Sequence, residues 1–471
     1  MRAAGWGTRG ARRGMGDAGR GLAVLAVCAI SLARSSAAQD TTRTPRPAPR
    51  VTAIRNGTVL TMTGAAQRGA TVLIRGGKIA GVGANLTIPS DATIVDATGK
   101  YVMPGLIDAM TYFGIDAQDL AEASDPITPE LRIIDAYDPT GMGFVSGAGP
   151  LRASELLIGG VTAQYVGPGD ATIVSGQGAI VKTAGQSIGE ITVKEPAAMD
   201  MSVGAGPTKT FRAKNRTPNT HPAVMALLRQ SLIRAQEYDR SWQTYNARPD
   251  TARARMAPPK REAGMEALVK VLHRQLPARI QANTVTDIRG AMRLAEEFGF
   301  DLIINGGAQA YQMKAELAAK KIPVVLGPIS HPFISGDEIP DLKEYPAPDE
   351  RNAAWLRQAG VPIAIASYSH GLGGLAQPIT GKWLLIDAAL AQGYGLPEDE
   401  VLRAVTLYPA QILGVADRLG SIENGKDADV IILDGPPLSM KTWVESVYVG
   451  GELVYSRGSG AVLAGEQRRP R

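Results

Sequence analysis

The stretch MPGLIDAMTYFG, from Met103 to Gly114, ends an apolar run with two side chains that invite a chemical reading. Met110 and Tyr112 are two residues apart, and in a strand that spacing turns both side chains to the same face. A hydrolytic zinc site needs imidazoles or carboxylates at such positions. A thioether is a soft ligand and a neutral phenol is a weak one. The stretch therefore predicts a strand whose end provides only poor ligands for zinc.

The whole chain has only four histidines, and they form no HxH, HxxH or HxxE pair. His273 lies in a basic amphipathic segment and is predicted to be a surface or packing residue. His221 precedes a proline, which favours a loop role. His331 and His370 each follow a predicted strand, so both can face one rim. A site built from these two is the metal-binding alternative, although it lacks a carboxylate.

No nucleophile stands out either. The only cysteine, Cys28, lies near the N-terminus in an apolar run. Ser175 begins SGQG, which resembles part of a GxSxG elbow but lacks the first glycine. Ser369 and His370 are adjacent in sequence, which does not place a base against a nucleophile. The sequence thus predicts no catalytic residue of the nucleophilic type.

Residues 1–38 have the order of a cleaved secretory signal: a basic leader, an apolar run from Gly21 to Ala33, and small residues before Gln39. A membrane anchor is the alternative, but 13 apolar residues are too few to span a bilayer. Met1 and Met15 are the two candidate translation starts. The leader carries six arginines and one aspartate, so its removal takes the net charge from +5 to 0. We expect a periplasmic or secreted protein with no nucleic-acid partner and no membrane association after cleavage.

Two kinds of sequence pattern divide the rest of the chain into regions. After a Pro/Thr-rich linker at 39–49, short β segments with turn glycines fill 50–103 and again 416–460. Asn56-Gly57, Gly76-Gly77 and Gly450-Gly451 are predicted hairpin turns. Both ends therefore predict one composite β-sandwich domain, with a disordered tail at 461–471.

Strands and helices alternate over residues 104–415, for example a strand at 277–283 followed by a helix at 286–298 that Gly299 stops. Repeated βα units predict a parallel sheet, and this length favours a TIM-like (β/α)8 barrel. A doubly wound sheet is the alternative, but no GxGxxG follows a first strand. Residues 243–262 form a basic insertion, predicted to be solvent-exposed.

Residues 50–456 resemble the metal-dependent amidohydrolase superfamily, in its imidazolonepropionase-like branch. The segments that carry the resemblance include VDATGKYVMPGLIDA, EASDPITPELRIIDAYDP, SGQGAIVKTAG and LYPAQILGVADRLGSIENGKDADVIILDG. The resemblance implies a TIM-like barrel with a small β-sandwich domain. It also implies hydrolysis of carbon–nitrogen bonds other than peptide bonds, with zinc or another divalent metal as cofactor.

Transferred onto this chain, the family's metal ligands fall on residues that are neither histidine nor carboxylate. The family's HxH pair falls on Met110 and Tyr112, and its later ligands fall on Gln281, Gly306 and Tyr368. The last position is Ser367 if the register differs by one. The resemblance thus implies vestigial ligand positions lining the barrel mouth, with no catalytic residue and no cofactor expected.

Three hypotheses follow. The first is an inactive pseudoenzyme, either a homo-oligomer or a heterodimer with a catalytic paralogue. The second is an active hydrolase that recruits His331, His370 or Asp108 in a non-standard site, or that acts without metal. The third is a periplasmic protein that binds a neutral polar small molecule through the phenols and amides of the mouth, namely Tyr112, Gln281, Asn283, Asn305 and Tyr368.

Overall fold

A computed structural model describes residues 50–458, apart from 117, 140–141, 146–148, 153–154, 186, 328, 330–348 and 369–382, and apart from the side chains of 140–155. The described residues belong to one compact unit, 49–471. The predicted signal at 1–38, the linker at 39–49 and the tail at 461–471 lie outside them. Within the described part, no helix is both long enough and apolar enough to cross a bilayer.

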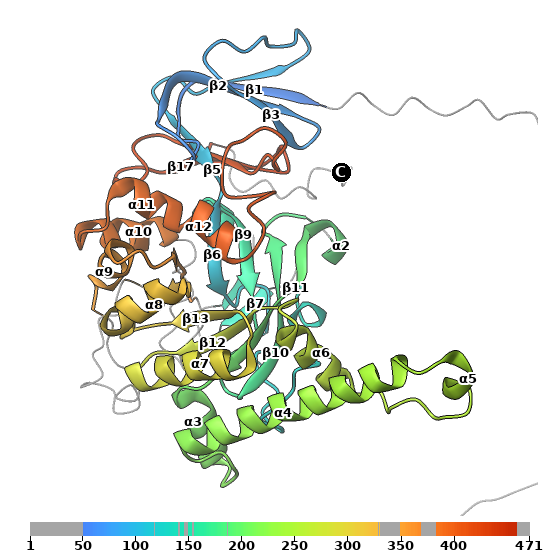
Figure 1. Ribbon diagram of the computed structural model, residues 1–471. Coiled ribbons are helices and arrows are strands. Elements are labelled where there is room, and N and C mark those ends of the chain that lie inside the picture. Colours follow the sequence, from blue (N-terminus) through green and yellow to red (C-terminus); the bar gives the residue numbers. More distant parts are fainter. Residues whose placement is uncertain are drawn as a thin grey trace, which may run out of the picture. The chain divides into compact units, whose positions relative to one another are not determined.

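Strands from both ends of the chain form one eight-stranded sheet, in the order β18-β17-β16-β5-β1-β2-β3 with β4 beside β1 (Figure 1). Gly76-Gly77 and Gly450-Gly451 turn the β2–β3 and β17–β18 hairpins with positive φ angles, as predicted. The strands are β1 (Val51–Val59), β2 (Gln67–Arg75), β3 (Lys78–Gly83), β4 (Thr93–Asp96), β5 (Tyr101–Pro104), β16 (Val430–Leu433), β17 (Val444–Val449) and β18 (Glu452–Ser456).

The predicted hairpin at Asn56-Gly57 is wrong. These residues lie inside β1, where the pairing with β2 shifts register between Ile54 and Gly57. Asn56 has φ 63°, a left-handed conformation that Asn tolerates. A Cβ on Gly57 would lie 2.8 Å from Cγ2 of Val102. The pair therefore makes a bulge that lets β1 pack closely against its neighbour, instead of a turn.

The barrel sheet has the order β15-β14-β13-β12-β11-β10-β9-β6. It approaches closure where the peptide nitrogen of Tyr368, after β15, donates to the carbonyl of Met110 in β6 (3.0 Å). The strands are β6 (Leu106–Thr111), β9 (Val161–Val166), β10 (Val174–Lys182), β11 (Thr192–Ser202), β12 (Ala278–Ala282), β13 (Leu302–Gly306), β14 (Val324–Leu326) and β15 (Ile363–Ile365). This arrangement, with the sheet domain, confirms the predicted TIM-like barrel and β-sandwich.

One strand departs from the regular barrel pattern. β10 runs antiparallel to both β9 and β11, while the other neighbouring strands are parallel. The cause is the short link between β9 and β10, residues 167–173, because a parallel pair needs a much longer crossover. An alternation of strands and helices in the sequence does not reveal this reversal.

Helices cover the outside of the barrel (Figure 1). Helix α7 (Val285–Phe298) matches its prediction: Thr284 and Asp287 form a capping box, and Gly299 ends the helix at φ 75°. The other helices are α1 (Glu155–Ile158), α2 (Ile188–Ile191), α3 (Ala205–Ala213), α4 (His221–Asn246), α5 (Asp250–Arg253), α6 (Ala263–Leu272), α8 (Lys314–Lys320), α9 (Asn352–Gln358), α10 (Leu384–Gly393), α11 (Glu398–Ala404) and α12 (Leu407–Ile412). Two 3-10 turns, η1 (Ile133–Asp135) and η2 (Ala310–Met313), and the hairpin β7 (Met142–Val145) with β8 (Gly149–Arg152) complete the elements.

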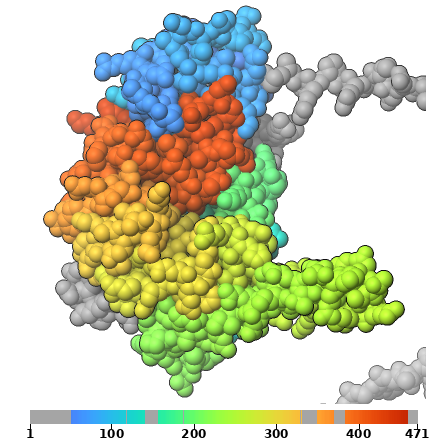
Figure 2. All heavy atoms as spheres, viewed as in Figure 1, coloured from blue at the N-terminus to red at the C-terminus, as the bar shows by residue number. Residues whose placement is uncertain are grey.

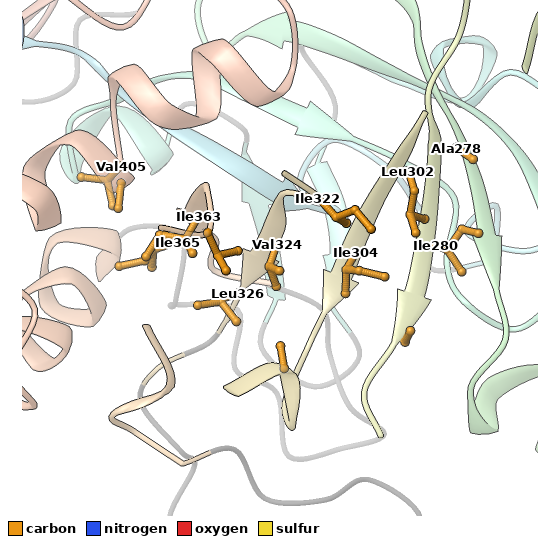
Figure 3. Close-up of a cluster of buried hydrophobic side chains, with 14 of the residues drawn as sticks. Ala278, Ile280, Leu302, Ile304, Ile322, Val324, Leu326, Ile363, Ile365 and Val405 are labelled. Carbon is orange, nitrogen blue, oxygen red and sulfur yellow. The ribbon is translucent and has the colours of Figure 1, made fainter. Parts of the chain in front are cut away.

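Alternate residues of the barrel strands have opposite surroundings. Figure 3 shows the outward set, which packs in the core between the strands and the helices: Ala278, Ile280, Leu302, Ile304, Val324, Leu326, Ile363 and Ile365. The residues between them turn into the barrel, where Ile303, Val325 and Ala364 join a second buried cluster with Tyr165 of β9. By the same alternation, β12 turns Arg279 and Gln281 inward, toward the candidate site.

Candidate functional site

Asp108 joins the first and last strands of the barrel. Its buried carboxylate accepts hydrogen bonds from the backbone nitrogen (3.0 Å) and the hydroxyl (2.5 Å) of Ser367, and from the nitrogen of Met110 (3.3 Å). Burial raises the pKa of Asp108 to about 6, against the effect of these hydrogen bonds. The hydroxyl of Ser367 is thus committed to Asp108, and the carboxylate to closing the barrel.

Met110 and Tyr112, the two side chains at the end of β6, have different surroundings. Met110 is buried and packs in the inner barrel cluster beside Ile107 and Ala109. Tyr112 is partly buried against the same cluster. Burial raises the pKa of the Tyr112 phenol well above its usual value, and the nearby Asp170 adds to the shift. The phenol therefore stays neutral at physiological pH.

The three later positions lie in one hydrogen-bonded group. The amide nitrogen of Asn305 donates to Oε1 of Gln281 (2.7 Å). The hydroxyl of Tyr368 lies 2.7 Å from Oδ1 of Asn305 and accepts a hydrogen bond from the backbone nitrogen of Gly306 (2.6 Å). The side chains of positions 281 and 368 are therefore joined through Asn305.

Gly306 has no room for a side chain. Its φ is 90°, and a Cβ there would lie 2.3 Å from Oδ1 of Asn283 and 2.8 Å from Nε2 of Gln281. The amides of β12 and of the residue that follows it occupy the space a ligand side chain would need. With the amides in these places, only glycine fits at position 306 without a clash.

Sequence reasoning missed Arg279, the largest fully buried side chain of the described residues. Its Nε and Nη2 atoms donate to Oδ1 of Asn305 (3.1 and 2.5 Å). Its guanidinium lies 4.2 Å from the ring centre of Tyr165, and its Nε lies 3.8 Å from Oδ1 of Asp200. Within the described part of the chain, its Nη1 has no hydrogen-bond partner. The signal was available: in ARIQA, alternation places Arg279 on the same inward face as Gln281.

A carboxylic acid accompanies this cation. The hydroxyl of Tyr165 donates to Oδ2 of Asp200 (2.5 Å). Burial raises the pKa of Asp200 to about 7, while Arg279 and Tyr165 act in the opposite direction. Asp200 therefore holds a proton more readily than an exposed carboxyl group, which weakens its ability to balance the charge of Arg279.

Two glycines make room for the Tyr165–Asp200 pair. A Cβ on Gly178 would lie 2.0 Å from the Tyr165 hydroxyl, and one on Gly167 would lie 2.7 Å from Oδ2 of Asp200. The hydroxyl of Ser175 is buried and bonded to Thr172 (2.9 Å). The SGQG segment is therefore a packing feature of β10, as expected from its missing glycine, and not a nucleophile elbow.

Two of the four histidines are described, and both lie near carboxylates on helices. Nδ1 of His221, at the start of α4, is 3.5 Å from Asp287, and Nε2 of His273 is 2.8 Å from Asp239. His331, Ser369 and His370 lie outside the described residues. Among the residues that are described, no three His, Cys, Asp or Glu side chains lie together in a way that could hold a metal ion.

Comparisons with known proteins agree on one family. The sequence model of the Amidohydrolase family matches residues 302–454. The amidohydrolase tasK of Hapsidospora irregularis is 25% identical over 77% of the chain, which spans only 37% of that longer protein. The imidazolonepropionase of Mesorhizobium japonicum is 26% identical over 81% of the chain and 91% of its own length.

A solved structure matches this chain along its own full length. The crystal structure of an amidohydrolase from Thermotoga maritima MSB8 is 33% identical, with a TM-score of 0.75, and the match covers 86% of this chain and 100% of that one. Together with the barrel and the sheet domain shared by both ends, this likeness confirms the predicted resemblance. The chain belongs to the amidohydrolase superfamily, in its imidazolonepropionase-like branch.

Proposed function

We propose that this chain is a catalytically inactive member of its family, a pseudoenzyme that keeps the barrel and works without a hydrolytic metal centre. The observation that carries the proposal is the buried guanidinium of Arg279, hydrogen-bonded to Asn305 beside the vestigial positions Gln281 and Tyr368. A divalent cation bound by these positions faces a fixed positive charge. In a low-dielectric interior that repulsion is far stronger than in water.

The donors at the vestigial positions also fit a divalent metal poorly. The space beside Gly306 is filled by amides. Burial raises the pKa of the Tyr112 and Tyr368 phenols, so both stay neutral. Neutral phenols and amides are weak ligands for zinc, and the thioether of Met110 is a soft one. Donor chemistry and local charge therefore support the same proposal.

Metal analysis of the purified protein tests it. We expect far less than one zinc, manganese or iron atom per chain, with no turnover of amides, lactams or cyclic imides before or after divalent metal is added. The imidazolonepropionase of Mesorhizobium japonicum, purified and assayed in parallel, is the control for metal loading. One tightly held metal per chain, lost on chelation together with hydrolysis, would overturn the proposal.

A barrel without a metal centre can still function by binding a ligand or by associating with another subunit. We infer from the leader at 1–38 that the protein is exported. We also infer that it acts as a partner subunit, because the fold is kept while the metal-ligand positions carry other residues. Fractionation of cells that make the full chain tests export. The expected product begins at Gln39 and is found in the soluble periplasmic or extracellular fraction. Retention of the leader, or a cytoplasmic product, contradicts it.

A metal-independent hydrolase is the second candidate, and Asp200 favours it. A carboxyl group with a pKa near 7 can give or take a proton at physiological pH. This candidate expects turnover that survives chelation and is lost in Asp200→Asn. The first proposal expects no turnover in either protein, so the same substrate panel separates the two.

A further inference from the structure

We propose that two copies of this chain associate through a basic arm, residues 243–262, that docks on an acidic segment, residues 116–138, of the other copy. The arm has five basic and two acidic residues, a net charge of +3. The segment has seven acidic residues and one arginine, a net charge of −6. Surfaces of opposite charge attract and orient each other as they meet.

The arm extends away from the helices around it. It comprises the last turn of α4, the short helix α5 and the return to α6, and Figure 2 shows this part of the chain (light green) projecting beyond its neighbours. Edge-to-face contacts of Trp242 with Tyr238 and Tyr245 line the helix that leads into it. Those contacts stiffen the base of the arm, so less freedom is lost when it docks.

Charge is displayed on both surfaces. Arg248, Arg255 and Lys260 of the arm are exposed. Every acidic side chain of the segment is exposed as well: Asp116, Asp119, Glu122, Asp125, Glu130, Asp135 and Asp138. Each surface also shows a large apolar side chain amid these charges, Met256 in the arm (45% exposed) and Leu131 in the segment (39% exposed). An apolar centre within a polar rim is the usual composition of a protein interface.

The two surfaces are neighbours on one subunit. A Cβ on Gly264, at the start of α6 where the arm ends, would lie 2.7 Å from Oε2 of Glu130 in the segment. A two-fold axis beside such a pair brings each arm onto the partner's segment, and each contact occurs twice. A second copy of this chain is therefore the occupant that satisfies both surfaces at once.

Charge reversal provides a reciprocal test by light scattering after gel filtration. We expect a dimer in dilute salt that dissociates as salt rises, because exposed charge pairs are screened. Arg255→Glu with Lys260→Glu takes the arm from +3 to −1. A separate variant with Asp116→Lys, Asp119→Lys, Glu130→Lys and Asp135→Lys takes the segment from −6 to +2. Each variant should give a monomer. An equimolar mixture of the two variants should restore the dimer, since both arm–segment contacts are then between opposite charges.

The control reverses two exposed charges of the sheet domain, Arg68→Glu with Arg75→Glu, and should leave the dimer unchanged. Far-UV circular dichroism and thermal melting of every variant separate loss of association from loss of folding. A monomeric native chain, a dimer that survives both reversals, or folded variants that fail to associate on mixing would each overturn the proposal. None of these readouts depends on metal content or hydrolysis.

Discussion

The guanidinium of Arg279 lies 4.2 Å from the ring centre of Tyr165, whose hydroxyl donates to Asp200. A cation, an aromatic face and a carboxyl group are thereby stacked inside the barrel, beneath the strand ends where the family resemblance puts a metal. Cation–π attraction and hydrogen bonds to Asn305 hold the guanidinium in place. The positive charge at this place in the barrel is thus supplied by the side chain of Arg279.

Replacing Arg279 should destabilise the fold strongly. Arg279→Met removes the donors to Asn305 and leaves Asp200 without its positive neighbour. Taking the donors away from a buried acceptor costs about 1–3 kcal/mol, since Asp200 can bind a proton once the cation is gone, and we expect that loss in urea unfolding. Arg293→Met, at an exposed site on α7, is the matched control and should change stability by less than about 0.5 kcal/mol. Equal effects of the two substitutions would show that the buried network contributes little.

Asp200 should make stability fall as pH rises. Its folded pKa of about 7 lies above the ordinary value of 3.8, so between these values the folded state binds more protons than the unfolded state. Unfolding free energy then decreases from about pH 4 to about pH 7, by at most about 1.4 kcal/mol per pH unit. Asp108, with a pKa of about 6, acts in the same direction.

Urea midpoints measured from pH 4.5 to 8 isolate the Asp200 part of this dependence. Asp200→Asn should flatten the decline relative to the native protein, while Asp108 continues to contribute in both. Asp301→Asn, at an exposed site before β13, is the control and should keep the native profile. Identical profiles for the native and Asp200→Asn proteins would mean that the carboxyl group titrates normally.

Gly306→Ala should cost more than its backbone conformation alone explains. The left-handed φ costs about 1–2 kcal/mol, and the clash with the amides of Asn283 and Gln281 adds about 1–3 kcal/mol. Gly299→Ala is the matched control, because Gly299 has φ 75° but nothing within 4 Å of an added Cβ. Asn283→Ala in the Gly306→Ala background should recover part of the loss. If Gly306→Ala and Gly299→Ala cost the same, the amides yield freely.

Lys182 should be the charge that ties the barrel to the sheet domain. Its Nζ lies 2.9 Å from Asp427 and 2.9 Å from Asp429, and all three side chains are buried. Lys182→Met leaves two carboxyl groups without this cation, which should cost about 3–5 kcal/mol. Lys78→Met, whose half-exposed amine pairs with Asp427 from the other side, should cost at most about 1 kcal/mol. Thermal melting compares the two, and an equal loss would contradict this account.

Local signals predicted the parts of the fold whose causes are local. The alternation and turn glycines at both ends match strands of one sheet, and Thr284, Asp287 and Gly299 bound α7. The same kind of signal failed at Asn56-Gly57, where left-handed backbone serves a bulge instead of a turn. A local pattern specifies a conformation, whereas the neighbouring strand decides how that conformation is used.

For the site, the residue types alone determined that sulfur, phenol and amide groups, or no side chain at all, stand at Met110, Tyr112, Gln281, Gly306 and Tyr368. Only the tertiary structure decided that Asn305 links two of these groups, that amides fill the space beside Gly306, and that Arg279 lies buried among them. The physical reason is that these contacts join strands far apart in sequence. Their energies depend on burial and on distances that no single segment contains.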